Sequence, residues 1–523
     1  MDNYFVSSCK RVKDWICRQF GQKEKKTVHH KKFANGGEVI VWETGRAGEE
    51  AASYENLFLR KEIAGFRTNI RREQSCSIKS LTRDYLYKQL LSSGEYTFDH
   101  MLVIKDPYGE APLTALALFI LEEPARVRVT TKGNLEVTDF VTELPKKKEH
   151  RVPILGMYAE KANDIVIEIL DDEGNCVKSH TFTIRTKRLP KSLRNVITVK
   201  KWTDKPAYSN IMINGGVKIH TCVFDIEGKI RYYLSRKPRG YGIFPLSDGH
   251  FFYMEKYISV PSYSNPQTVE SYDMDYFGRV FRTYLTEKGV HHTAEEKAGG
   301  NILTGSNSML EHTEDCVIEI DRQTGEIVWQ LNMAEIFDET YQNMMDWCHV
   351  NSAAYYEKDR TILISLRNVH AVICVDYDTK KLRWILSDPK FWEGTKMTPY
   401  LLQPEGDVKW CYQQHAAFEI ALPDESNPQK KRIIVYDNHW AKRRKAKSFD
   451  KDPLSYVSFY DIDEEKKTVS LHKRFAGPKT RIRANGIYVP DKRRVYNMAG
   501  SYAEPVDGDG GGIFEYDYET GEV

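Results

Sequence analysis

The sequence lacks several features that define broad classes of protein. Its 523 residues hold 76 Lys and Arg against 74 Asp and Glu, so it has no basic excess of the kind that nucleic-acid binders show. The longest apolar run, residues 115–121 (ALALFIL), is far shorter than the roughly 18 residues typical of a membrane-spanning helix. We therefore expect a folded chain with no nucleic-acid partner and no membrane partner.

Paired cysteines and a leader segment are also missing. The nine cysteines are an odd number and form no Cys-x-x-Cys pair, a pattern that suits neither a disulfide framework nor a cysteine-rich zinc site. A secretory signal needs an uninterrupted apolar core. The N-terminal segment has none, because the charged residues within 10–14 (KRVKD) interrupt it. The chain therefore looks cytoplasmic.

The features that are present favour β structure. Hydrophobic residues make up 41% of the chain and aromatic residues 12%, and rings pack well on pleated sheets. Residues 1–79 are predicted to form an arm that leads into a helix over residues 80–92, where leucines recur at helical spacing. Short β-rich runs follow, and they predict a small β-sandwich domain over residues 80–190.

An internal repeat occupies residues 200–523. Each copy has an apolar run that ends in Asp, then a polar turn and a second strand, as in IEIDRQTGEIVWQL and CVDYDTKKLRWIL. The copies recur roughly every 50 residues, with one longer step, which is typical of propeller blades. The aligned aspartates are Asp225, Asp275, Asp321, Asp376, Asp461 and Asp517.

These patterns predict an all-β fold: a six-bladed β-propeller preceded by a small N-terminal β-sandwich domain. The clearest blade reads as four strands, HVNSAAYYE, TILISLR, AVICVDYD and KLRWIL. The sixth copy stops at Val523, before its second strand. We expect either that the run EVIVWE, residues 38–43, completes this blade or that the sequence is truncated there.

Several polar residues are placed to meet at the centre of such a propeller. The first strand of a blade lines the central channel, and His349 and Asn351 (DWCHVNS) and His415 (QQHAAFEI) begin such strands. Arg367 ends the strand that pairs with the one after His349, and His250 (SDGHFFY) is expected to reach the same rim. Arginine offers a fork of donors that matches tetrahedral oxyanions, and a neutral imidazole is a nucleophile or an acid–base group near pH 7.

At these residues the sequence resembles the bacterial arylsulfate sulfotransferases. The resemblance covers residues 80–523 and rests on DWCHVNSAAYYEKDRTILISLRNVHAVI, QHAAFEI, SDGHFFY and DPYGEAPLTALALF with its later partner RVPILGMY. It implies a six-bladed propeller behind an N-terminal β-domain. It also implies transfer of a sulfuryl group from a phenolic sulfate to a phenol, without a nucleotide sulfate donor, a cofactor or a metal.

The resemblance also implies roles for individual residues. His415 would be the nucleophile that becomes transiently sulfated, and Tyr108 would reach the site from the N-terminal domain. The groups that hold the sulfate oxygens would be His250, His349, Asn351 and Arg367. A covalent step of this kind predicts ping-pong kinetics. The family's members are often periplasmic, in contrast to the cytoplasmic location expected above, and a homodimer is left open.

Other interpretations of the same residues remain. His250, His292, His349 and His415 could instead hold a metal ion in a hydrolase or lyase, although no His-x-His or His-Glu-x-x-His spacing occurs. A propeller scaffold without catalysis is a third alternative. Aromatic residues of the long insertion are candidates for stacking on phenol rings, with ordinary loop packing as the alternative: Phe391, Trp392, Trp410 and Tyr412.

Overall fold

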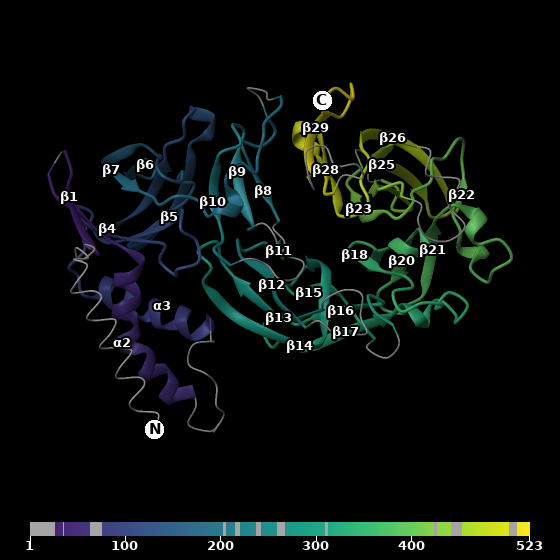
Figure 1. Ribbon diagram of the computed structural model, residues 1–523, viewed down its shortest axis with the longest axis horizontal. Helices are drawn as coiled ribbons and strands as arrows, with labels where there is room; N and C mark the ends of the chain where they lie inside the picture. The colour runs from purple at the N-terminus through teal and green to yellow at the C-terminus, as the bar shows by residue number, and fades with distance from the viewer. Residues whose placement is uncertain are drawn as a thin grey trace. The chain divides into compact units, whose positions relative to one another are not determined.

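The chain forms two compact units (Figure 1). The computed structural model describes residues 27–34, 36–62, 76–201, 206–214, 220–236, 242–258, 267–308, 312–422, 426–440, 452–501 and 510–523. Unit 1 comprises residues 1–199, 222–235 and 277–279, and unit 2 comprises residues 200–221, 236–276 and 280–523. Most of the predicted arm therefore belongs to the same unit as the N-terminal β-domain, although residues 1–26 and 63–75 lie outside the described ranges.

Unit 1 is built on one bent sheet in the order β1-β2-β3-β4-β6-β7, with β5 also paired to β4. The long strand β4 joins two halves, because its first part pairs with β3 and its last part pairs with β6. The apolar run at residues 115–121 is the buried start of β4. The strands are β1 (Val28–Lys32), β2 (Glu38–Trp42), β3 (His100–Lys105), β4 (Ala115–Thr131), β5 (Phe140–Ile154), β6 (Ala162–Leu170) and β7 (Cys176–Arg185).

One of the two expectations for the sixth blade, that the run EVIVWE completes it, is wrong. Its residues form β2, which pairs antiparallel with β1 and parallel with β3 inside the N-terminal sheet. Val39, Ile40 and Val41 are buried there. A short apolar strand can add to any open sheet edge of matching polarity, so its composition alone does not identify its partner.

Two helices belong to unit 1, α2 (Thr44–Glu62) and α3 (Cys76–Ser92). The predicted helix over residues 80–92 is confirmed, and it begins one turn earlier. Leu86 and Leu91 face the core as the spacing predicts, but Leu81 is 39% exposed. No helix among the described residues is long and apolar enough to cross a membrane.

The hairpin of β9 (Cys222–Asp225) and β10 (Ile230–Tyr233) carries the first copy of the repeat but packs in unit 1. Its Arg231 is fully buried; the guanidinium donates to the carbonyl oxygens of Gly156 and Thr138, both at 2.7 Å. The same group lies 4.0 Å from the ring centre of Tyr158 and 3.5 Å from the Asp225 carboxylate. A buried charge needs such partners, so Arg231 anchors this hairpin to the N-terminal sheet.

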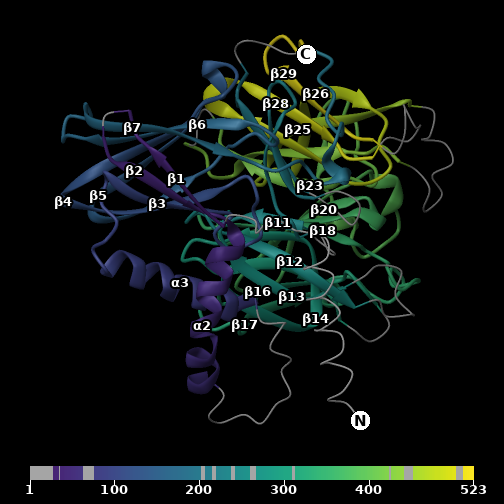
Figure 2. The ribbon, with the colours of Figure 1, turned by 60° about the vertical axis from the view of Figure 1, so that its left-hand side comes forward.

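Unit 2 is a succession of sheets that follow one another in chain order along an arc, from teal to yellow in Figures 1 and 2; their strands pair antiparallel except β22, which pairs parallel with β26. The four strands predicted for the clearest blade are confirmed as β18-β19-β20-β21. The strands are β8 (Asn210–Ile213), β11 (Gly242–Pro245), β12 (Phe251–Ile258), β13 (Gln267–Met274), β14 (Val280–Glu296), β15 (Ile302–Ser306), β16 (Cys316–Ile320), β17 (Ile327–Asn332), β18 (Val350–Tyr356), β19 (Thr361–Leu366), β20 (Ala371–Asp376), β21 (Leu382–Leu386), β22 (Gln403–Pro404), β23 (His415–Ile420), β24 (Lys430–Asp437), β25 (Leu454–Asp463), β26 (Thr468–Pro478), β27 (Ala484–Val489), β28 (Arg494–Ala499) and β29 (Gly512–Asp517).

Neighbouring sheets of unit 2 pack through apolar side chains. Leu303 and Val317 of one sheet share a buried cluster with Ala353, Ile362 and Ile373 of the next. Alternation along each strand turns apolar residues toward the adjacent sheet, as in any face-to-face packing of sheets. The expected all-β propeller fold is confirmed.

Strand direction divides each blade of unit 2 into two ends. Val350, at the start of β18, pairs with Leu366, at the end of β19, and Leu366 pairs with Ala371, at the start of β20. We call this end the entry rim. The opposite end holds the β18–β19 and β20–β21 turns, and we call it the turn rim.

Candidate active site

Three blades place a histidine at the entry rim, where the first strand begins. The ladders of β18, β23 and the second part of β14 each shift register within their first residues. Positive φ angles of 59°, 55° and 49° accompany these shifts at His292, His349 and Ala416. Bulges re-aim side chains, and left-handed non-glycine residues concentrate at functional sites. The repeated bulge explains how successive blades turn imidazoles toward a common centre.

Two carboxylates hold His349. Its Nδ1 lies 2.6 Å from Oε2 of Glu314 and 3.0 Å from both oxygens of Asp346. Burial alone would lower the pKa of this imidazole, but the charges of Glu314 and then Asp346 outweigh it and raise the pKa of His349 to about 9. His349 is therefore an imidazolium at neutral pH.

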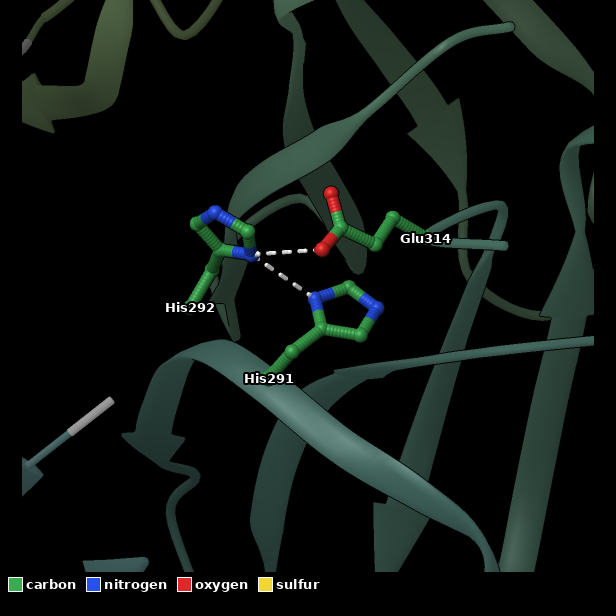
Figure 3. Close-up of side chains that lie close together, drawn as sticks. All are labelled: His291, His292 and Glu314. Carbon is green, nitrogen blue, oxygen red and sulfur yellow. Dashed lines mark hydrogen bonds and ion pairs between the residues drawn. The ribbon is translucent and has the colours of Figure 1, made fainter. Parts of the chain in front are cut away.

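The same Glu314 faces two further histidines, which Figure 3 shows together. His292 Nδ1 lies 3.9 Å from Oε1 of Glu314 and 3.1 Å from Nδ1 of His291, whose Nε2 lies 2.8 Å from the Ser306 carbonyl oxygen. Burial lowers the pKa of both histidines, despite the opposing charge of Glu314. These two rings are therefore neutral, and the ring of His292 packs edge-on against that of His349 at 4.7 Å.

His415 has a different environment. Its Nδ1 lies 2.6 Å from Oδ1 of Asn438, and its Nε2 accepts from the backbone N–H of Arg483 at 3.3 Å. Burial, followed by the charge of Arg367, lowers the pKa of His415 to about 3. This imidazole stays neutral throughout the physiological range, as a nitrogen nucleophile requires.

Arg367 and Asn351 lie between these histidines. Arg367 follows β19 and donates to the side-chain oxygens of Gln413, at 3.1 Å, and Asn368, at 3.3 Å. The side-chain amide of Asn351 donates to the Gln414 carbonyl oxygen at 2.8 Å. Both donors are thus fixed by the segment that leads into β23, which places them beside His415.

These groups also lie close enough to influence one another electrostatically. The charges of Arg367 and His349 both lower the pKa of His415, and the proximity of His415 contributes to the lowered pKa of His292. The structure therefore brings together predicted residues His349, Asn351, Arg367 and His415. It adds His292, which was expected to open another inner strand and was a predicted ligand in the metal-dependent alternative; its place at the start of that strand matches that of His349.

The prediction that His250 reaches this rim is wrong. His250 lies in the tight turn between β11 and β12, which is at the turn rim. Its Nδ1 is 2.6 Å from Asp273 and 3.2 Å from the guanidinium of Arg322, and its ring stacks on Phe281 at 4.1 Å. These partners come from other turn-rim hairpins, so His250 joins a structural ion-pair network at the end opposite the histidine cluster.

Tyr108 belongs to unit 1 and has partners there. Its hydroxyl donates to Asp84 at 2.5 Å, and Arg279 binds the same carboxylate at 2.7 Å. The ring contacts Tyr87 and Phe277 at 5.7 and 6.2 Å. Burial and the Asp84 charge hold the pKa of Tyr108 well above its ordinary value. Its role in substrate binding stays a prediction.

The aromatic residues of the long insertion divide into two groups. Trp392 is 1% exposed and packs with Phe337 in a core cluster, and Trp410 packs against the next cluster. For these two, ordinary packing is the better interpretation. Phe391 and Tyr412 contact each other at 6.1 Å, and Tyr412 directly precedes Gln413, the partner of Arg367, so this pair lies nearer the entry rim.

Two sets of side chains have the composition of a cation site. One is His291, His292 and Glu314, and the other is Glu314, Asp346 and His349, with ligand atoms within 4.8 Å of one another in each. They share Glu314, whose pKa is held well below its usual range by the histidines despite its burial. Neither set includes His415 or His250, so the ligand set proposed from the sequence is not assembled.

Comparisons with known proteins agree with this geometry. The profile of the Arylsulfotransferase (ASST) family matches residues 195–523, and that of the arylsulfotransferase Ig-like domain matches residues 102–187. Two curated proteins, each described as arylsulfate sulfotransferase AssT, come from Escherichia coli O6:H1 and Lelliottia amnigena. Each is 22% identical to this chain, and the alignment covers 80% of this chain and 88% of the relative.

Solved structures give a weaker likeness. An auxiliary nutrient binding protein from Bacteroides thetaiotaomicron matches 73% of this chain and 91% of its own at 12% identity, with a TM-score of 0.34. The WD40 domain of Toxoplasma gondii coronin matches 78% and 73% at 9% identity, with a TM-score of 0.31.

Proposed function

The chain belongs to the arylsulfotransferase family and is an aryl sulfate sulfotransferase, and from that premise we propose that it works in two steps through a sulfated His415. A phenolic sulfate donates its sulfuryl group to Nε2 of His415, and a second phenol then receives it. The observation that carries this proposal is the neutral, buried imidazole of His415 next to the fixed guanidinium of Arg367. A nucleophile and an anion-binding group are thereby held together.

In the first step the Nε2 lone pair attacks sulfur, an N–S bond forms and the S–O bond to the aryl oxygen breaks. The departing phenolate takes the bonding electron pair and a proton from the imidazolium of His349. In the second step the acceptor phenol returns a proton to His349 and its oxygen attacks sulfur, which frees His415. Arg367 and Asn351 hold the sulfate oxygens, and positioning with charge stabilisation lowers the barrier as in phosphoryl transfer.

The proposal needs no nucleotide sulfate donor. The sequence contains no Gly-x-x-x-x-Gly-Lys-Ser/Thr phosphate-binding loop, and a phenolic sulfate already carries its own leaving group. Steady-state rates measured against donor at several acceptor concentrations should give parallel reciprocal plots. Intersecting plots would show that both substrates must bind together and would overturn the two-step scheme.

The direct test is to trap the intermediate. Enzyme mixed with an aryl sulfate and no acceptor should release one equivalent of phenol in a burst and gain one sulfuryl group on the peptide that holds His415. His415→Asn should abolish both the burst and the modification. As a control, His472→Asn removes an exposed histidine of β26 that binds Tyr518 and should leave the burst unchanged.

A metal-dependent reaction is the second candidate, because Glu314 lies in two sets of side chains with suitable donors. Turnover after exhaustive chelation separates the two. A sulfuryl transfer through His415 should survive chelation, whereas loss of turnover that Zn²⁺ or Mn²⁺ restores would favour the metal-dependent reaction.

A further inference from the structure

Asn438, which directly follows β24, contacts the ring of His415 through its side chain. Its Oδ1 lies 2.6 Å from Nδ1 of His415, and Asn438 itself is completely buried. An amide side chain can present either its oxygen or its NH₂ group, so its orientation decides which nitrogen of the imidazole carries the proton.

A group of buried hydrogen bonds surrounds the amide of Asn438 and is compatible with an amide oxygen that faces His415. Asn438 Nδ2 donates to Thr480 Oγ1 at 2.9 Å, Thr480 Oγ1 donates to Ser455 Oγ at 3.1 Å, and Ser455 Oγ donates to the Asn438 carbonyl oxygen at 2.8 Å. Thr480 Oγ1 also lies 3.4 Å from the Tyr436 hydroxyl, and Thr480 and Ser455 are fully buried. In this arrangement the NH₂ group faces Thr480, and the amide oxygen faces His415 as an acceptor.

The second ring nitrogen gives independent evidence. Nε2 of His415 lies 3.3 Å from the backbone N–H of Arg483, which can only donate. Nε2 therefore carries a lone pair and Nδ1 carries the proton, which is the tautomer that the Asn438 oxygen also requires. Two contacts from different elements thus select one tautomer.

The neutral charge of Asn438 also matters. The histidine at the equivalent place in the preceding blade, His349, is bound by two carboxylates and is held as a cation. A carboxylate at position 438 would do the same to His415 and remove its lone pair. The charged and titratable groups around His415 are Arg367 after β19, His349 before β18, His292 in β14, Arg483 before β27 and Asp437 at the end of β24.

We propose that Asn438 is a positioning residue that holds His415 as the neutral tautomer with its proton on Nδ1, so that the lone pair that attacks sulfur lies on Nε2, where it accepts the Arg483 backbone N–H in the resting protein. Thr480 and Ser455 act through Asn438 by holding its amide in this orientation. The proposal rests on the proposed function for its consequence, but the tautomer itself is a property of the resting protein.

The tautomer can be measured without turnover. In protein labelled with ¹⁵N-histidine, the two ring nitrogens of His415, assigned by their loss in His415→Asn, should show a protonated Nδ1 and an unprotonated Nε2. Asn438→Leu should remove this preference. A protonated Nε2 in the wild-type protein would overturn the proposal, whatever the enzyme catalyses.

Kinetics test the charge. In the acceptor-free burst, Asn438→Asp should move the acidic limb of the pH–rate profile upward by about one pH unit or more, and Asn438→Leu should lower the burst rate about 10- to 100-fold with the donor KM nearly unchanged. Thr480→Val should give a smaller loss. Asn301→Leu is the matched control, because its amide binds Glu319 at the turn rim, and it should change neither quantity.

The outcomes separate the two proposals. An unmoved acidic limb in Asn438→Asp would overturn the positioning role even if His415 is sulfated. If Asn438→Leu fails to fold, as judged by circular dichroism, the Asp and Thr480→Val variants decide alone. Absence of any burst or sulfated His415 in the wild-type protein would overturn the two-step mechanism and leave the tautomer measurement standing.

Discussion

Replacing Glu314 by Gln should change the pH range in which the enzyme works. Glu314 is the closer carboxylate to His349, and its charge is the main reason that the pKa of His349 rises to about 9 from an ordinary 6.5. That difference corresponds to roughly 3 kcal/mol of preference for the imidazolium. Without the Glu314 charge, burial opposes mainly Asp346, and we expect the pKa of His349 to fall substantially.

The magnitude follows from the fraction of His349 that is protonated. At pH 8 this fraction is about nine-tenths in the wild-type protein, and a fall to about one-tenth would slow the burst about tenfold. The assay uses unsubstituted phenyl sulfate without acceptor, because a poor leaving group needs the proton and no acceptor phenol titrates. With 4-nitrophenyl sulfate, whose phenolate leaves without help, the effect should shrink.

The result that refutes this reasoning is an alkaline limb near pH 9 in both the wild-type protein and Glu314→Gln. Glu319→Gln is the control, since Glu319 is also a buried carboxylate but binds Lys297 at 2.6 Å. Stability should follow the same group. A raised pKa in the folded state stabilises the protein below the unfolded pKa of 6.5, and this stabilisation is lost as the pH rises through 9. Denaturant unfolding should therefore show the wild-type protein losing more stability than Glu314→Gln between pH 6.5 and 9.

Three further substitutions test other parts of the structure. Arg367→Lys should lower kcat/KM about 100-fold in spite of its retained charge, because an ammonium cannot present the bidentate fork; a near-normal value would contradict the assigned contact. His250→Gln should leave kcat within about twofold and lower Tm, because it breaks the Asp273 network at the turn rim, and a large loss of kcat with unchanged Tm would restore His250 to the site. Arg231→Met should destabilise unit 1 by about 3–5 kcal/mol in urea unfolding, because the carbonyl oxygens of Gly156 and Thr138 lose their donor and the buried Asp225 loses a cation; a change below about 1 kcal/mol would show that Arg231 does not anchor the hairpin.

Much of the fold was predictable because blades repeat. An apolar strand, a polar turn and a second strand recur with aspartate in register, and the β18–β21 sheet has the four strands that its sequence indicated. The partner of β2 was not predictable, since Val39, Ile40 and Val41 suit any buried strand. The repeat pattern also does not predict that the β9–β10 hairpin belongs to unit 1, where Arg231, the single charged residue of β10, is buried.

The site was predictable in part for the same reason. His349 and His415 stand at the start of the first strand in two different blades. Because the first strands of all blades begin at the same rim, both histidines are expected there. His250 follows the Asp-Gly of a tight hairpin turn, and that signal, correctly weighed, places it at the turn rim. Glu314 lies in a loop with no periodicity, and only folding brings it to His349, so its contribution could not be inferred from spacing.

The arrangement solves a problem that two histidines in one buried site would otherwise create. An imidazole that attacks sulfur must be neutral, and an imidazole that protonates the leaving oxygen must be charged, yet burial alone would leave both neutral. At the entry rim the two histidines have different partners and therefore different protonation states. Glu314 and Asp346 bind His349, whereas the uncharged Asn438 binds His415. Because the His349 and Arg367 charges also lower the pKa of His415, the groups that would donate the proton and bind the sulfate in the proposed reaction keep His415 unprotonated as well. Removing either positive charge should therefore make His415 easier to protonate, so binding of the anion and readiness of the nucleophile depend on the same groups.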